Sequence, residues 1–134
     1  MKSLKIECVI FERNPLLIDF NKLRTNENET INFDNYISID LNVDMVLKAL
    51  FEKDDPDYEL DFPKDRLISD SFMDDLICFI NDENKIAPPI LELVGQRVII
   101  RDGKHRLGLM RFLNMQTIPF LVLKSNIEKF KYLS

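Results

Sequence analysis

The sequence has no tryptophan, a single histidine and only two cysteines, and these scarcities exclude several kinds of site. Cys8 and Cys78 lie among apolar residues and lack a metal-ligand spacing, so we expect buried thiols in a reducing compartment. No apolar run approaches the ~20 residues that a membrane-spanning helix needs. The apolar stretch at the N-terminus is too short and too interrupted for a secretory signal. The scarcities therefore predict a cytoplasmic protein with no membrane segment.

The composition is that of a folded domain. The chain has 134 residues, of which 46% are hydrophobic and 31% are charged, which is enough apolar material for a real core. This length fits one compact domain and leaves little room for a second. We therefore expect residues 1–134 to form a single domain.

The charge is divided unevenly along the chain. The net charge is −5, yet residues 1–95 carry 10 basic and 21 acidic side chains, whereas residues 96–134 carry 8 basic and 2 acidic ones. Duplex binding depends mainly on neutralising phosphates, so an acidic chain is not expected to bind nucleic acid sequence-specifically. A basic cluster within an acidic protein suits a small anionic ligand better. Alternatively, the two halves neutralise each other across a surface, or the acidic half meets a protein partner.

Hydrophobic periodicity and turn residues predict a mixed order of strands and helices, and thus an α/β (mixed α+β) fold with a small mixed sheet and flanking helices. We expect strands at residues 4–11, 36–41, 90–94, 97–100 and 118–123. We expect helices from Asn42 or Asp44 to Phe51, from Ser69 to Asn84, from Lys104 to Leu113, and after Ser125-Asn126 to Phe130. Polar loops are expected at residues 24–35 and 52–66, and a tight turn at Gly95-Gln96. Around the last strands, the expected core comprises Leu93, Ile99, Leu107, Met110, Phe112 and Leu121.

The densest chemistry in the sequence is the run Asp102-Gly103-Lys104-His105-Arg106, between an apolar strand and an amphipathic helix. Such a strand–loop–helix, here within residues 86–123, directs backbone N–H groups and the positive helix end at one point. Glycine allows a ligand to approach closely, lysine supplies a point charge, and arginine can grip a phosphate with two parallel bonds. An aspartate beside this cluster could bind a metal ion or accept a proton. The run therefore predicts a site for phosphate or a similar anion.

Each of these residues also has an ordinary interpretation when it is taken alone. Asp-Gly is a common turn, and Asp102 could simply cap the helix. His105 could be a partly buried residue without a role in chemistry. The case for a site rests on the run as a whole.

This part of the chain resembles the core of the ParB/sulfiredoxin superfamily. That core has a helix, a strand pair, a Gly-x-His-Arg or related phosphate loop, a helix, and a strand that opens with Ile-Pro or Val-Pro. The matching segments here are Ser69–Asn84, Pro89–Ile100, Asp102–Arg106, Leu107–Asn114 and Ile118-Pro119-Phe120. The resemblance covers about residues 65–123, and residues 1–60 are an unassigned extension expected to pack on this core.

Departures from the family narrow what the resemblance implies. Sulfiredoxins have their catalytic cysteine directly after the loop glycine, where this chain has Lys104, so reductase activity is not expected. ParB partition proteins continue into a second nucleotide motif and a helix-turn-helix, for which a chain ending at Ser134 leaves no room. Small-molecule kinases of the superfamily share the Asp-Gly-x-His-Arg pattern.

The resemblance thus implies a nucleoside triphosphate ligand, ATP or CTP, with Mg²⁺, or another phosphorylated small molecule. Gly103, Lys104, His105 and Arg106 would contact the phosphates, Asp102 would bind the metal, and Asp102 and His105 would serve catalysis. One function class is an enzyme that transfers phosphoryl groups to a small molecule or hydrolyses the triphosphate. The other is a protein-interaction or regulatory module that retains the fold. An enzyme would need a second acid opposite the loop, for which the candidates are Glu12, Glu92 and the Asp54–Asp61 run.

Overall fold

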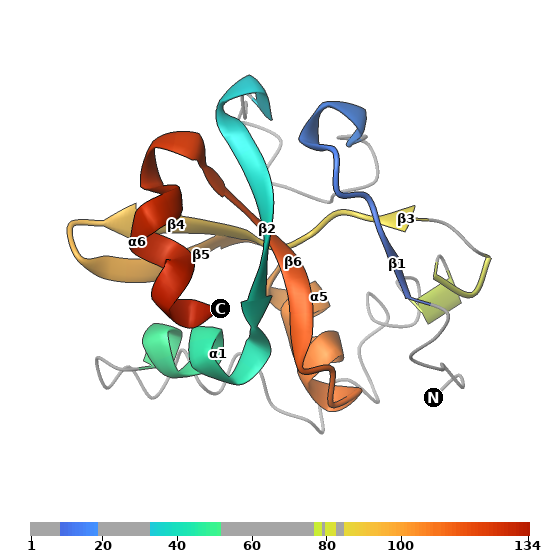
Figure 1. Cartoon of the computed structure of the whole chain (residues 1–134). Coiled ribbons are helices and arrows are strands. Elements are labelled where there is room, and N and C mark those ends of the chain that lie inside the picture. The colour runs from blue at the N-terminus through green and yellow to red at the C-terminus, as the bar shows by residue number, and fades with distance from the viewer. Residues whose placement is uncertain (1–8, 19–32, 52–76, 79, 83–84) are drawn as a thin grey trace.

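The computed structural model describes residues 9–18, 33–51, 77–78, 80–82 and 85–134. The predicted mixed α/β fold is confirmed: a four-stranded mixed sheet and a small two-stranded parallel sheet are combined with helices. Figure 1 shows two strands of the larger sheet, β2 and β6, crossing the middle of the molecule, with the small sheet to one side. No helix in the part of the chain that the structure describes is long and apolar enough to cross a membrane.

The elements follow the predicted order closely. The strands are β1 (Ile10–Phe11), β2 (Tyr36–Asn42), β3 (Lys85–Ile86), β4 (Ile90–Val94), β5 (Arg97–Asp102) and β6 (Thr117–Leu123). The α-helices are α1 (Val43–Phe51), α5 (Lys104–Phe112) and α6 (Ile127–Phe130). Single 3₁₀ turns are η2 (Pro15–Leu17), η4 (Phe33–Asn35), η5 (Lys124–Asn126) and η6 (Lys131–Leu133). Residues 77, 78, 80 and 81 are also helical, within the helix expected over Ser69–Asn84.

The larger sheet has the strand order β2-β6-β4-β5. β2 is antiparallel to β6, β4 and β5 form an antiparallel hairpin, and β4 runs parallel to β6 with Ile90 opposite Leu121. Gly95 turns the hairpin with a φ of 64°, as the expected tight turn requires. Part of the segment expected to be an extension thus supplies a strand of the sheet itself.

Side chains that alternate along the strands separate the buried residues into two clusters. In the larger cluster, Phe120 and Val122 of β6 pack with residues of α1, α5 and α6. The smaller cluster lies on the opposite side of β6, where it includes Leu121 and Ile90. Its full set of buried members is Phe33, Tyr36, Ala87, Ile90 and Leu121.

The predicted core is only partly correct. Leu107, Met110 and Leu121 are fully buried, whereas Leu93 and Phe112 are partly buried at the margin of the larger cluster. Ile99 is only half-buried and belongs to neither cluster. The register explains this outcome, because Val98 pairs with Leu93 and Ile100 with Leu91 on the core face, which turns Ile99 to the other face.

Side-chain caps begin two elements, α1, which was predicted, and η2, which was not. The Oδ1 atom of Asn42 accepts a hydrogen bond from the Met45 N–H at 3.0 Å, so Asn42 is the N-cap of α1. The Oδ1 atom of Asn14 accepts from the Leu16 N–H at 3.0 Å and caps η2. Asn126 precedes α6 without a side-chain cap bond, unlike the expectation for Ser125-Asn126. The expectations for residues 4–8, 24–32, 52–66 and 69–76, and for Cys8, lie outside the described residues.

Candidate phosphate-binding loop

The predicted loop is a sharp connection of one residue between β5 and α5. Asp102 is the last residue of β5, Lys104 is the first of α5, and Gly103 between them has a φ of 97°. The Gly103 carbonyl accepts the first helical hydrogen bond from the Leu107 N–H at 2.8 Å, and Gly103, the N-cap residue, has no side chain to cap the helix. The first N–H groups of a helix have no intrahelical partner and carry partial positive charge. The connection therefore has the backbone form of an anion site.

Gly103 is held against the segment that leads into β4. A Cβ atom at Gly103 would lie 2.8 Å from the Cα of Pro89 and 3.1 Å from its Cβ. The Pro89 carbonyl also accepts a hydrogen bond from the Leu121 N–H at 2.9 Å, which joins this segment to β6. Sequence reasoning missed this role of Pro89, because the contact joins residues that are distant in the chain. Pro89 thus fixes the position of the loop relative to the sheet.

Arg106 points back toward the loop and is only 5% exposed. Its Nη2 atom lies 3.4 Å from Oδ2 of Asp102, and the same atom would be 2.8 Å from a Cβ at Gly103. Burial lowers the pKa of Arg106, and the Asp102 carboxylate opposes that effect through its charge and hydrogen bond. The structure thus brings together three of the predicted site residues, with the arginine buried beneath the loop and paired with the aspartate.

The other two residues of the motif begin the helix. Lys104 is half-buried at the first position of α5. His105 follows in α5, and its side chain lies outside what the structure describes. Lys104 therefore brings a cationic side chain to the N-terminal end of the helix.

The candidate second acids lie in different places. Glu92 of β4 accepts a hydrogen bond from Arg101 of β5, with Oε2 and Nη1 3.2 Å apart. Burial raises the pKa of Tyr36 above its ordinary value. The charge of Arg101 acts in the opposite direction, and the charge of Glu92 adds to the increase. Tyr36 of β2 therefore lies within electrostatic reach of this ion pair, a grouping that the sequence did not reveal. Because the Glu92 carboxylate is paired with Arg101 of β5, it does not serve as the second acid opposite the loop.

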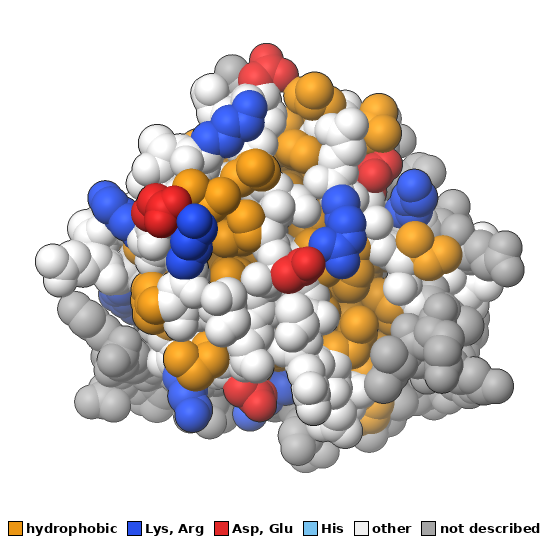
Figure 2. Space-filling model, in the orientation of Figure 1, with side chains coloured by type: hydrophobic (Ala, Val, Ile, Leu, Met, Phe, Trp, Pro, Cys, Tyr) orange, Lys and Arg blue, Asp and Glu red, His pale blue; other side chains and the backbone are white. Residues whose placement is uncertain are grey.

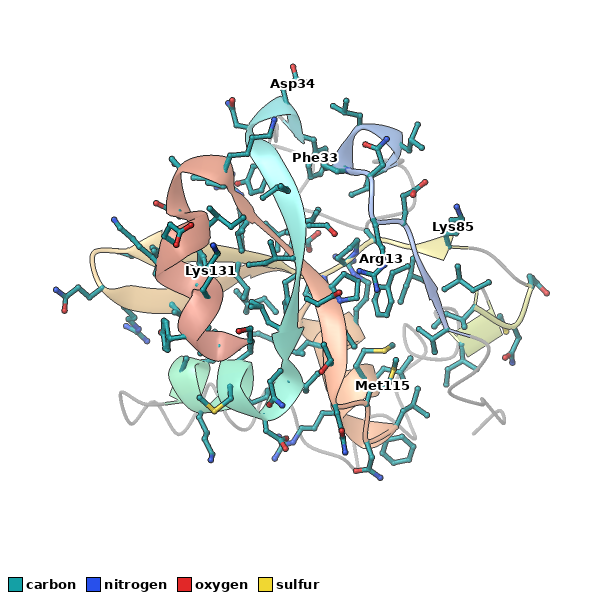
Figure 3. All side chains as sticks on the ribbon, viewed as in Figure 1. Arg13, Phe33, Asp34, Lys85, Met115 and Lys131 are labelled. Carbon is teal, nitrogen blue, oxygen red and sulfur yellow. The ribbon has the colours of Figure 1, made fainter. Side chains whose placement is uncertain are left out.

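Of the remaining candidates, Glu12 is the one that lies among the described residues. Glu12 follows β1, and its backbone N–H donates to the Ile86 carbonyl at 2.9 Å, beside the small sheet. The neighbouring Arg13, labelled in Figure 3, pairs with Asp40 of β2 at 2.6 Å. The Asp54–Asp61 run lies outside the described residues. Within the ranges that the structure describes, no three His, Cys, Asp or Glu side chains are grouped to hold a metal ion.

Part of the basic surplus of residues 96–134 is neutralised by local ion pairs. Arg101 pairs with Glu92 and Arg106 with Asp102. Lys131, labelled in Figure 3, pairs with Glu128 at 2.8 Å. Figure 2 likewise shows blue and red side chains interspersed on one face, with hydrophobic side chains between them. At the loop itself, Lys104 and the start of α5 contribute positive charge.

Comparison of the chain with protein-family models, with curated proteins and with solved structures found no match.

Proposed function

We propose that this chain is a phosphate- or nucleotide-binding domain with a ParB/sulfiredoxin-like core. The proposal is carried by the connection between β5 and α5, where one left-handed glycine leads directly into the helix, with Lys104 at its first position. Backbone N–H groups at a helix start and an adjacent cation suit the oxygens of a phosphate. The order β4, β5, loop, α5 and β6 is also the order that the family resemblance predicts.

In this proposal, the backbone of Gly103 and Lys104 contacts the phosphate, and the Lys104 ammonium neutralises part of its charge. A glycine is favoured at the point of closest approach because it has no side chain between ligand and backbone. His105, the next residue of the motif, is proposed to complete the phosphate contacts. The ligand is a nucleoside triphosphate such as ATP or CTP, with Mg²⁺, and the domain acts in the cytoplasm.

We favour a binding function over a catalytic one because the Asp102 carboxylate is already paired with Arg106. A general base or a metal ligand needs a carboxylate that can face the substrate or the ion. Catalysis by Asp102 and His105, with transfer or hydrolysis of the terminal phosphoryl group, is thus the second candidate. It would require Asp102 to leave Arg106 when Mg²⁺ and nucleotide bind. A non-enzymatic regulatory module requires no such change.

Calorimetry with ATP, CTP and inorganic tripolyphosphate, each with and without Mg²⁺, tests the proposal. We expect the parent protein to bind at least one of them, and Lys104→Gln to bind about tenfold more weakly because a charge-assisted contact is lost. Lys124→Gln is the matched control, since Lys124 is an exposed lysine in η5. Equal weakening in both variants, or no binding by the parent at millimolar ligand, would contradict the proposal. If the parent binds nucleotide, release of inorganic phosphate from it would indicate an enzyme, and no release would indicate a binding module.

A further inference from the structure

We infer that Arg106 is a positioning residue that holds Asp102 and the loop, and that it does not itself grip the phosphate. The inference rests on the proposed phosphate site and assigns a role within it. The Arg106 side chain turns back from α5 toward the end of β5. The guanidinium Nη2 atom lies 3.4 Å from the Asp102 carboxylate, and the side chain of Arg106 is almost fully buried.

The packing around the guanidinium fixes the loop from beneath. The Arg106 Nη2 atom and the Pro89 Cα atom each lie 2.8 Å from the position that a Cβ at Gly103 would occupy. The loop glycine is therefore confined between an arginine from the following helix and the backbone before β4. Because a cavity in this position would let the loop shift, Arg106 determines where the first N–H groups of α5 are directed.

The charge of Arg106 also removes an obstacle to anion binding. Asp102 is adjacent to Gly103, and its carboxylate would repel a phosphate at the start of α5. Its ion pair with Arg106 is mostly shielded from water, so screening by solvent is weak there. Arg106 thus neutralises the one acidic side chain of the motif, which lowers the repulsion of an anion at the start of α5.

A double-mutant cycle separates this role from direct phosphate contact. With inorganic tripolyphosphate as the probe, we expect Arg106→Gln to weaken binding about tenfold, since the Asp102 charge is left without its partner. Adding Asp102→Asn should restore most of the affinity, because the repelling charge is then gone and the glutamine side chain still fills part of the space beneath Gly103. If Arg106 gripped the phosphate directly, the double variant would stay as weak as Arg106→Gln. Arg97→Gln is the control, because Arg97 is an exposed arginine at the other end of β5.

Guanidinium NMR on the unmutated protein tests the same role without any change to the fold. We expect the Nη–H signals of Arg106 to be protected from exchange without ligand, and to keep their shifts when tripolyphosphate is added. Large shifts of these signals, together with an unrescued double variant, would overturn the inference. If the parent binds neither tripolyphosphate nor nucleotide, the proposed function fails. The Arg106 signals of the parent and of Asp102→Asn would still show whether Arg106 holds Asp102, and equal signals in the two proteins would overturn that pairing.

Discussion

Gly103 and Pro89 lie in direct backbone contact, since a Cβ built on Gly103 would come within 2.8 Å of the Pro89 Cα. The contact joins the candidate phosphate-binding loop to the residue before β4, the strand that pairs with β6, and so places α5 relative to the sheet. Any side chain at residue 103 would have to displace backbone rather than a flexible side chain.

Gly103→Ala is therefore expected to be strongly destabilising. The left-handed conformation alone costs a residue with a Cβ roughly 1–2 kcal/mol, and the contact with Pro89 adds to this cost. Gly95→Ala is the matched control, because Gly95 also has a positive φ, of 64°, but no atom within 4 Å of its Cβ position. Denaturant unfolding should show a larger loss for Gly103→Ala, and equal losses would contradict the close contact.

The core around the loop makes a second prediction. Leu107→Ala and Leu121→Ala should each lower the free energy of unfolding by ~2–5 kcal/mol, because both side chains are fully buried. Ile99→Ala should cost clearly less, because this side chain is half-buried and outside both clusters. Chemical denaturation of the three variants measures the difference. A cost for Ile99→Ala as large as that for Leu107→Ala would show that the assigned register of β5 is wrong.

The start of α1 depends on one side-chain cap. Asn42→Ala removes the acceptor of the Met45 N–H and should destabilise the protein by about 1 kcal/mol. Asn42→Asp keeps an acceptor oxygen near the positive helix end and should retain most of the stability. Thermal unfolding of the pair tests the cap, and similar melting temperatures for both variants would argue against it.

Tyr36 makes stability depend on alkaline pH. Burial raises its pKa, so the unfolded chain loses the phenolic proton at a lower pH than the folded protein does. The contribution of the protonated Tyr36 phenol to the free energy of unfolding is fully present below the ordinary tyrosine pKa of about 10. It falls as the pH rises above that value. Unfolding free energies between about pH 8 and about pH 11 should therefore fall more steeply in the parent than in Tyr36→Phe. Tyr132→Phe, which removes an exposed phenol, controls for the loss of one titrating group, and equal slopes in the parent and Tyr36→Phe would refute the prediction.

Much of the fold was predictable because its signals are local. The alternation of Tyr36–Leu41 and the Asn42 cap predict β2 and α1, and the Gly95-Gln96 turn predicts the hairpin. The side of the sheet on which Ile99 lies was not predictable, because the run Val98-Ile99-Ile100 is apolar throughout. The pairing of β5 with β4 determines which of these side chains enter the core.

The candidate site shows the same division between local and long-range signals. The sequence placed the loop between a strand and a helix, which the structure also does. The spacing of Asp102 and Arg106, four residues apart at a helix start, could have indicated their ion pair. The contact between Pro89 and Gly103 has no local signal, since it depends on how β4 and β5 pair.

Amide chemical shifts during a titration test the central claim, phosphate binding at the start of α5, most directly. On addition of inorganic tripolyphosphate, we predict the largest shifts at the N–H groups of Gly103, Lys104 and His105, saturating with a single dissociation constant. The N–H groups at the start of α1, where Asn42 already caps the helix, should not move and serve as the internal reference. Shifts that are absent at the start of α5, or equally large at the start of α1, would contradict the account.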